Sequence, residues 1–309
     1  MFALDMWFDM FARGPQIVVG WVVLLLVVGL AVWLGSRAVR SARQHVGAPA
    51  DHLRTSRERP MEQVTDEPAA AARTEGNRLE RENRVLEAIL AAEDRQFREL
   101  REDMVETQIR ARGVRDEAVL RAMLRVPRQL FVSDSLRSVA YADCPQRIGH
   151  GQTISQPYIV ALMTELARPT ATSKALDVGT GSGYQAAVLA ELCQAVYGIE
   201  IVESLADEAK RRMAELGYSQ VTIRCGDGYR GWPDQAPFDL IIVAAAPSHI
   251  PQPLVDQLAE GGRLVIPVGD YFQELMVVEK TAGGLTRQRS VIPVAFVPMT
   301  GEAQRRDTD

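Results

Sequence analysis

The middle of the chain carries a glycine-rich segment, Leu-Asp-Val-Gly-Thr-Gly-Ser-Gly, which runs from Leu176 to Gly183. A glycine turn between a strand and a helix lets a ligand approach the backbone closely, because glycine has no Cβ and tolerates positive φ. A dinucleotide fingerprint would need its third glycine at position 184, where this chain has Tyr, and no Gly-Lys-Ser/Thr follows as in a Walker A loop. The segment therefore predicts a ligand site of another kind, with a purely structural turn as the alternative.

Acidic residues follow the neighbouring apolar stretches and could recognise an adenosine group. Glu200 lies about 20 residues beyond the first glycine, where a carboxylate can accept hydrogen bonds from both ribose hydroxyls. Asp227 could accept a hydrogen bond from the adenine amino group, and Asp177 would lie close to a cationic ligand. The alternatives are a solvated carboxylate for Glu200 and an Asx turn for Asp227. Together these residues resemble the S-adenosylmethionine site of class I methyltransferases. The expected cofactor-binding residues are Asp177, Gly179, Gly181, Gly183, Glu200, Gly226 and Asp227.

A second polar segment, Gly-Gln-Thr-Ile-Ser-Gln-Pro, spans residues 151–157. Its hydroxyl groups precede Pro157, and proline is favoured in the first turn of a helix. The apolar spacing over 158–166 predicts that helix. Because the hydroxyl of Thr153 or Ser155 could simply cap the helix, the segment alone does not distinguish a cap from a functional site.

Short apolar runs alternate with helical patterns from about residue 113 to residue 298, which predicts one α/β domain with a mainly parallel sheet covered on both faces. The expected strands are Lys174–Val178, Ala195–Ile199, Val221–Arg224, Leu240–Ala244, Arg263–Val268, Leu275–Val278 and Val291–Val297. The expected helices between them are Tyr184–Leu192, Glu203–Leu216 and Pro251–Leu258. The last two runs lie close together, which predicts an antiparallel hairpin at the sheet edge. In such a sheet, ligands bind outside the carboxyl ends of the strands.

Several segments together resemble the protein-L-isoaspartate O-methyltransferase family. They are Arg101–Val132, residues 151–157, the glycine turn, the Cys-Gly-Asp-Gly of 225–228, Pro237–Pro247, Glu260–Gly269 and Phe296–Met299. The resemblance covers residues 101–300. It implies an α/β, doubly wound, Rossmann-like fold: a seven-stranded, mostly parallel sheet with one antiparallel edge strand and added N-terminal helices.

The resemblance also implies a reaction. S-Adenosyl-L-methionine would be the cofactor, and its methyl group would pass to the free α-carboxyl of L-isoaspartyl (and D-aspartyl) residues in damaged proteins or peptides, which initiates protein repair. A carboxylate has a pKa near 4, so it is already an ionised nucleophile and needs no general base. By family position, Ser155 would be the catalytic residue that hydrogen-bonds the substrate carboxylate, and Thr153 and Ile154 would help to shape the same substrate-binding lip.

Other functions are disfavoured by composition and motif. The formal net charge is −5, so nothing global suggests a nucleic-acid partner. Enzymes that methylate base amino groups usually place Asp/Asn/Ser-Pro-Pro-aromatic after the fourth strand, but residues 244–248 read Ala-Ala-Ala-Pro-Ser. A membrane-tethered adaptor on an inactive fold and a methyltransferase for another carboxylate stay open as alternatives. The three cysteines and four histidines lie apart, so neither a disulfide framework nor a metal site is expected.

The first part of the chain predicts a membrane anchor. Residues 17–34 contain no charge and would span roughly 27 Å as a helix, close to the roughly 30 Å hydrocarbon core of a bilayer. Arg37, Arg40 and Arg43 follow, and positive charge on that side predicts a cytoplasmic catalytic domain anchored to the inner membrane through an N-terminal segment of residues 1–43. A cleaved signal peptide ending near Ala48–Ala50 is the alternative.

The remaining segments connect or flank the enzyme. Residues 44–76 are poor in large apolar side chains, which predicts a disordered linker. Residues 77–112 show helical spacing and could either form a weak dimer contact or pack on their own catalytic domain. The catalytic domain is expected over 101–300 and a polar tail over 301–309.

Overall fold

The computed structural model describes residues 91–306. The predicted membrane span (17–34), the linker (44–76) and the first part of the helical segment (77–90) lie outside the described residues. Within 91–306, no helix is both long enough and apolar enough to cross a bilayer.

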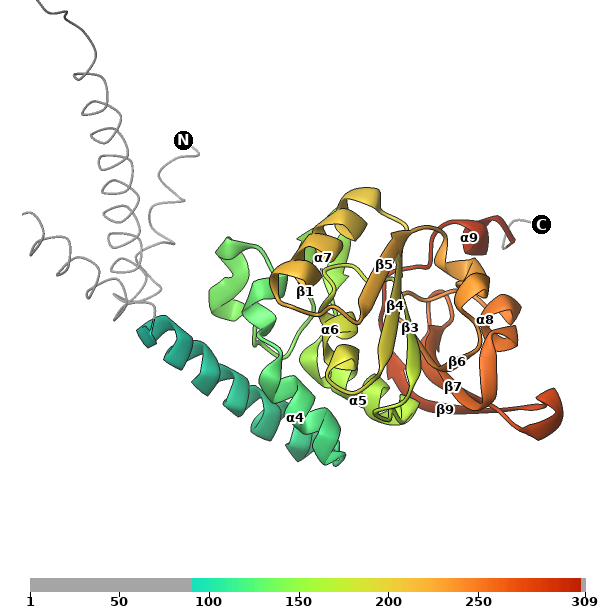
Figure 1. Ribbon diagram of the computed structural model, residues 1–309, viewed down its shortest axis with the longest axis horizontal. Helices are drawn as coiled ribbons and strands as arrows, with labels where there is room; N and C mark the ends of the chain where they lie inside the picture. The colour runs from blue at the N-terminus through green and yellow to red at the C-terminus, as the bar shows by residue number, and fades with distance from the viewer. Residues whose placement is uncertain (1–90, 307–309) are drawn as a thin grey trace, which may run out of the picture. The chain divides into compact units, whose positions relative to one another are not determined.

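Seven strands form one sheet in the order β5-β4-β3-β6-β7-β8-β9 (Figure 1). Their bounds are β3 Lys174–Val178, β4 Ala195–Glu200, β5 Val221–Cys225, β6 Phe238–Val243, β7 Leu258–Val268, β8 Gln273–Lys280 and β9 Thr286–Val294. The strands from β5 to β7 pair in parallel, whereas β8 is antiparallel to both β7 and β9. The sheet is therefore seven-stranded and mostly parallel, as predicted.

The reversed strand is β8, one position in from the edge, and not the edge strand itself. The loops that join β7 to β8 and β8 to β9 are short, and short loops can connect only antiparallel strands because a parallel pair needs a longer crossover. The expectation of an antiparallel edge strand was wrong in that detail. The expected hairpin between the last two strands is confirmed.

Helices cover both faces of the sheet. Their bounds are α4 Glu117–Arg125, α5 Pro157–Ala167, α6 Tyr184–Ala190, α7 Glu203–Glu215, α8 Gln252–Asp256 and α9 Glu302–Arg306. Side chains alternate between the two faces of a strand. Leu240 and Ile242 of β6 accordingly belong to the core under α5 and α6, while Ile241 and Val243 belong to the core under α8.

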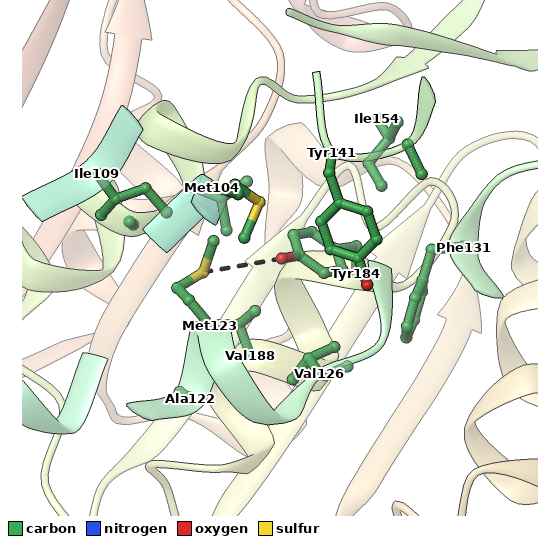
Figure 2. Packing of buried hydrophobic residues seen from close by; sticks show 14 of the residues in the cluster. Met104, Ile109, Ala122, Met123, Val126, Phe131, Tyr141, Ile154, Tyr184 and Val188 are labelled. Atoms are coloured by element: carbon green, nitrogen blue, oxygen red, sulfur yellow. Dashed lines mark hydrogen bonds between the residues drawn. The ribbon is translucent and has the colours of Figure 1, made fainter. Parts of the chain in front are cut away.

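The helical residues before α4 pack on the same domain. Residues 91–103 are α-helical, and a π-helical turn, η1 (Met104–Ile109), follows. Met104 and Ile109 are fully buried in one apolar cluster with Met123 of α4 and Tyr184 of α6 (Figure 2). The described part of the 77–112 segment thus packs on its own catalytic domain, one of the two alternatives that the sequence left open.

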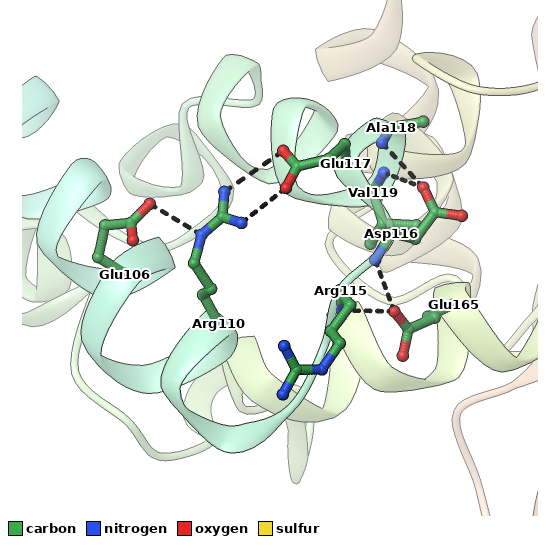
Figure 3. A network of polar contacts seen from close by, with 8 residues as sticks. All are labelled: Glu106, Arg110, Arg115, Asp116, Glu117, Ala118, Val119 and Glu165. Carbon is green, nitrogen blue, oxygen red and sulfur yellow. Dashed lines mark hydrogen bonds and ion pairs between the residues drawn. The ribbon is translucent and has the colours of Figure 1, made fainter.

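A shared carboxylate fixes the start of α4 against α5. Asp116 caps α4, because its Oδ1 accepts hydrogen bonds from the N–H groups of Ala118 (2.8 Å) and Val119 (3.2 Å). One Oε1 atom of Glu165, on α5, accepts from the N–H groups of both Arg115 (2.6 Å) and Asp116 (2.7 Å) (Figure 3). These bonds hold α5 in place, and α5 begins at Pro157, the last residue of the polar segment 151–157.

Candidate active site

A cleft of about 580 Å³ opens at the carboxyl ends of the parallel strands. Its position is where strand order reverses, because β4 and β6 lie on opposite sides of β3. The walls come from the glycine turn after β3, the end of β4, the loop after β6, the strand β2 (Gln152–Ile154) and the C-terminal segment. The lining residues are Gln152, Thr153, Val178, Gly179, Gly181, Ile199–Ile201, Gly228, Ala244, Ala245 and Val297–Thr300.

The glycine turn presents its backbone to this cleft. Gly179 and Gly181 both line it, and both have positive φ (79° and 53°), which glycine adopts without strain. Gly183 also has positive φ but lies outside the lining. A Cβ at Gly183 would come within 2.9 Å of the Met213 methyl carbon on α7, so the third glycine serves helix packing.

Glu200 is held at the cleft wall by two backbone hydrogen bonds. Its carboxylate accepts from the N–H of Gly181 (2.8 Å) and from the N–H of Val202 (2.9 Å), and the residue is only 5% exposed. Each carboxylate oxygen has two lone pairs, so each can still accept a hydroxyl proton from a ligand. The position therefore fits the predicted role as a ribose acceptor.

Asp177 lies directly behind the glycine turn and is fully buried. Neither of its carboxylate oxygens has a hydrogen-bond partner among the described residues, since the Thr180 hydroxyl donates to the main-chain carbonyl of Asp177 instead (3.2 Å). Burial raises the pKa of this carboxyl to about 7. Asp177 itself does not line the cleft, but its neighbour Val178 does. A positively charged ligand in the cleft would therefore stabilise the unpartnered carboxylate of Asp177.

Asp227 and Gly226 lie beside the cleft but outside its lining. The two carboxylate oxygens of Asp227 accept hydrogen bonds from the N–H of Tyr229 (3.0 Å) and from the N–H of Glu302 (2.8 Å). The neighbouring Gly228 lines the cleft. In this arrangement Asp227 ties the start of α9 to the end of β5, which the sequence did not indicate.

A second, larger groove of about 1040 Å³ adjoins the first. The two share Thr153, Ala244 and Val297. Ser155 lines only the second groove, which is otherwise mostly apolar. The remaining lining residues are Arg112, Pro145, Gln156, Ile159 and Ile292–Phe296.

The three predicted substrate residues do not all face the groove, because side chains alternate along an extended segment. Thr153 is exposed and Ser155 half-buried, whereas Ile154 between them is 4% exposed and belongs to the apolar core. Successive side chains of an extended segment point to opposite sides. Thr153 and Ser155 thus reach the groove, and Ile154 supports it from behind.

Arg128 fixes the backbone at Ser155 and was missed by the sequence reasoning. Its side chain is fully buried, and it donates to the carbonyl oxygens of Ala140 (2.7 Å) and Ser155 (2.7 Å). The guanidinium also lies over the Tyr184 ring, 4.8 Å from its centre. Tyr184 follows the glycine turn directly, so one buried cation connects the substrate segment with the cofactor turn.

The C-terminal segment forms one wall of both clefts. The N–H of Ala246 donates to the carbonyl of Val297 (2.8 Å), and the N–H of Met299 donates to the carbonyl of Ala246 (2.7 Å). This bridge places 297–300 beside the loop that follows β6. Residues 302–306, expected as part of a polar tail, form α9.

Comparison with known proteins agrees with this geometry. The family model for protein-L-isoaspartate(D-aspartate) O-methyltransferase matches residues 98–304. A protein-L-isoaspartate O-methyltransferase from Picosynechococcus sp. is 55% identical over 204 residues, which cover 66% of this chain and 91% of that protein. One from Gloeobacter violaceus is 56% identical over 201 residues, covering 64% and 98%.

Solved structures show the same likeness. A protein-L-isoaspartate O-methyltransferase superposes with a TM-score of 0.61 at 27% identity, covering 67% of this chain and 69% of that one. A putative enzyme of this kind from Plasmodium falciparum, in complex with S-adenosyl-L-homocysteine, gives a TM-score of 0.57 at 29% identity, covering 65% and 98%. With its family match, its relatives and its clefts in agreement, the chain belongs to the protein-L-isoaspartate(D-aspartate) O-methyltransferase family.

Proposed function

We propose that the two adjoining clefts divide the family's reaction between them. The chain is an S-adenosylmethionine-dependent methyltransferase of L-isoaspartyl residues, which acts in protein repair. The smaller cleft, with the glycine turn and Glu200, takes the cofactor, and the larger groove, with Ser155, takes the substrate polypeptide. The observation that carries this assignment is the shared border of the two clefts at Thr153, Ala244 and Val297.

The residues of the smaller cleft fit S-adenosylmethionine. Gly179 and Gly181 leave backbone room for a ligand, Glu200 offers acceptors for ribose hydroxyls, and Asp177 supplies an unpartnered carboxylate behind the turn. The cofactor carries a sulfonium and an ammonium group, so a buried carboxylate here is electrostatically complementary to it. When bound, the cofactor supplies an electrophilic methyl group.

The protein's task is to position the substrate carboxylate. An α-carboxylate is ionised at neutral pH, so the chain has no proton to remove. Ser155 donates its hydroxyl hydrogen to one carboxylate oxygen and leaves the other free to face the cofactor cleft. Arg128 holds the Ser155 main chain from behind, and Thr153 stands at the border between the clefts. Such alignment can contribute several kcal/mol to the lowering of the barrier.

The substitution Ser155→Ala tests the assignment. We expect the variant to bind S-adenosylhomocysteine like the wild type in calorimetry, because Ser155 does not line the cofactor cleft, but to methylate an isoaspartyl peptide slowly. Ser133→Ala is a matched control, since Ser133 is an exposed serine whose hydroxyl lies 3.1 Å from that of Ser135. Near-normal turnover by the Ser155 variant would remove this residue from the mechanism.

The substrate range is tested with matched peptides. An isoaspartyl peptide, its normal aspartyl twin and its D-aspartyl isomer present the same side groups with the carboxylate in different places. We expect methylation of the isoaspartyl form, weaker methylation of the D-aspartyl form and none of the normal twin. Equal methylation of the aspartyl twin would favour the alternative of a methyltransferase for another carboxylate substrate.

The membrane anchor is a separate proposal, supported by the uncharged run of 17–34 and by the arginines at 37, 40 and 43. We expect full-length protein in the inner-membrane fraction, with its C-terminus on the cytoplasmic side. Fractionation with protease protection of a C-terminal tag tests this arrangement. A C-terminus cleaved only from the outer side would overturn the orientation, and a shortened soluble chain would favour a cleaved signal peptide.

A weak dimer through 77–112 rests on the helical spacing of that segment. Its described part buries Met104 and Ile109 in the catalytic domain, so these two side chains take no part in such a contact. Sedimentation of full-length chain and of a chain lacking residues 77–90 tests the proposal. Identical monomeric behaviour of both would refute it.

A further inference from the structure

Two adjacent aromatic side chains stand in solvent on the loop between β7 and β8. Tyr271 is 97% exposed and Phe272 is 94% exposed. The other exposed large hydrophobic residues of the described chain reach at most 72%, at Leu285. A fully exposed aromatic pair adds nothing to the stability of the fold, and exposed apolar patches commonly mark interaction sites.

The loop that carries the pair is anchored on both sides. The N–H of Gly269 donates to the Pro247 carbonyl (2.9 Å). Gly269 has φ of 126°, and a side chain there would collide with the Phe272 carbonyl oxygen, so glycine is required for this tight turn. On the other side, the Gln273 side-chain amide donates to the Phe296 carbonyl (3.1 Å), and its oxygen accepts from the Phe296 N–H (2.6 Å).

These bonds place Gln273, the residue directly after the aromatic pair, beside the wall of the substrate groove. Phe296 lines that groove, and Gln273, which holds its backbone at both polar groups, directly follows Phe272. Neighbouring Cα atoms lie about 3.8 Å apart. The same wall continues through the apolar residues 292–297. An extended chain that lies along this wall would therefore reach the exposed rings.

We propose that Tyr271 and Phe272 form an exosite for apolar side chains that flank the isoaspartyl residue in an unfolded polypeptide substrate. This inference rests on the proposed function of the groove. Damaged segments must be unfolded to enter an open groove, and unfolded segments expose the apolar side chains that an aromatic pair would bind. Continuity with the apolar groove wall favours a polypeptide over a lipid surface as the occupant.

The test compares two isoaspartyl peptides with the full-length chain. One is short and has only Gly and Ser flanks, and the other has the same centre with Leu and Phe further along. For the double variant Tyr271→Ser/Phe272→Ser, we expect kcat/KM for the longer peptide to fall about tenfold, mostly through KM. The short peptide should be methylated as by the wild type. Leu285→Ser, which removes an exposed side chain from the loop before β9, should change neither rate.

The outcomes separate the exosite from the function on which it rests. Equal kinetics of the double variant and the wild type on both peptides would overturn the exosite alone. Unchanged peptide kinetics with lost flotation on phosphatidylglycerol vesicles would assign the pair to lipid and also overturn it. A wild-type chain that methylates neither peptide would refute the proposed function itself.

Discussion

Replacing Glu200 with Gln tests how the cofactor cleft is built. In the wild type, the two carboxylate oxygens accept from the Gly181 and Val202 N–H groups. The amide of Gln is similar in size, but one of its two polar ends is an NH₂ group that cannot accept. One backbone N–H would then face a donor, and one ribose hydroxyl would lose its acceptor.

The size of the effect follows from the lost bonds. A hydrogen bond to a charged group contributes about 1.5–3 kcal/mol. Losing one such bond to the ribose would raise the dissociation constant of S-adenosylhomocysteine about 10- to 150-fold. The lost bond to Gly181 or Val202 would lower the free energy of unfolding by about 1–3 kcal/mol as well.

Calorimetric titration of the folded variant with S-adenosylhomocysteine measures the first effect, and urea unfolding measures the second. Glu203→Gln is the matched control, because Glu203 is an exposed glutamate at the start of α7 and lies outside the cleft lining. It should leave the dissociation constant as it is. An unchanged dissociation constant for Glu200→Gln would refute the assignment of Glu200 as the ribose acceptor.

Three further predictions concern neighbouring residues. Burial raises the pKa of Asp177 to about 7, so the unfolded state loses this proton first and wild-type stability falls as pH rises from about 4 to 7. Asp177→Asn should escape that loss, so at pH 8 its free energy of unfolding in urea should exceed that of the wild type by on the order of 4 kcal/mol. Parallel pH profiles of the two proteins would refute this. Arg128→Lys should leave one of the Ala140 and Ser155 carbonyls unpaired, which would lower both the free energy of unfolding, by about 1–3 kcal/mol, and kcat. A variant with unchanged kcat would show that Arg128 does not position Ser155. Gly183→Ala should lower the free energy of unfolding by about 1–2 kcal/mol without a direct effect on cofactor affinity, because alanine is strained at positive φ and its Cβ would collide with Met213. A variant of normal stability with weakened cofactor binding would instead assign Gly183 to the cofactor site.

The features that could be predicted from the sequence are those that depend on a local pattern of apolar residues and glycines. The strands from β3 to β6 lie within about two residues of their predicted bounds, since short runs of Val, Ile and Leu read clearly. β9 begins five residues early, because its ladder with β8 extends into the polar residues of 286–290. β7 also begins five residues early, because Leu258 already pairs with Phe238 of the parallel strand β6. The glycine turn and Glu200 could be predicted because each lies at the carboxyl end of a clearly apolar strand, β3 and β4.

Side-chain direction and distant partners were not predictable in the same way. Strand alternation could have separated Ile154 from its two hydroxyl neighbours, but only once residues 152–154 were known to be a strand. No local signal marks Arg128, because the two carbonyls that permit a buried guanidinium lie 12 and 27 residues away in the sequence. Asp227 likewise depends on Glu302, 75 residues further on.

The bridge between Ala246 and the segment 297–300 links the C-terminal end of the chain to ligand affinity. This stretch is attached to the loop after β6 through Ala246 and lines the cleft proposed for the cofactor. Cofactor binding and attachment of the segment would then stabilise each other to the same degree by thermodynamic reciprocity. Proteolytic removal of the chain from residue 297 onward would then first weaken binding of the methyl donor, while the rest of the domain stays folded. Saturating donor should conversely protect that end from a carboxypeptidase.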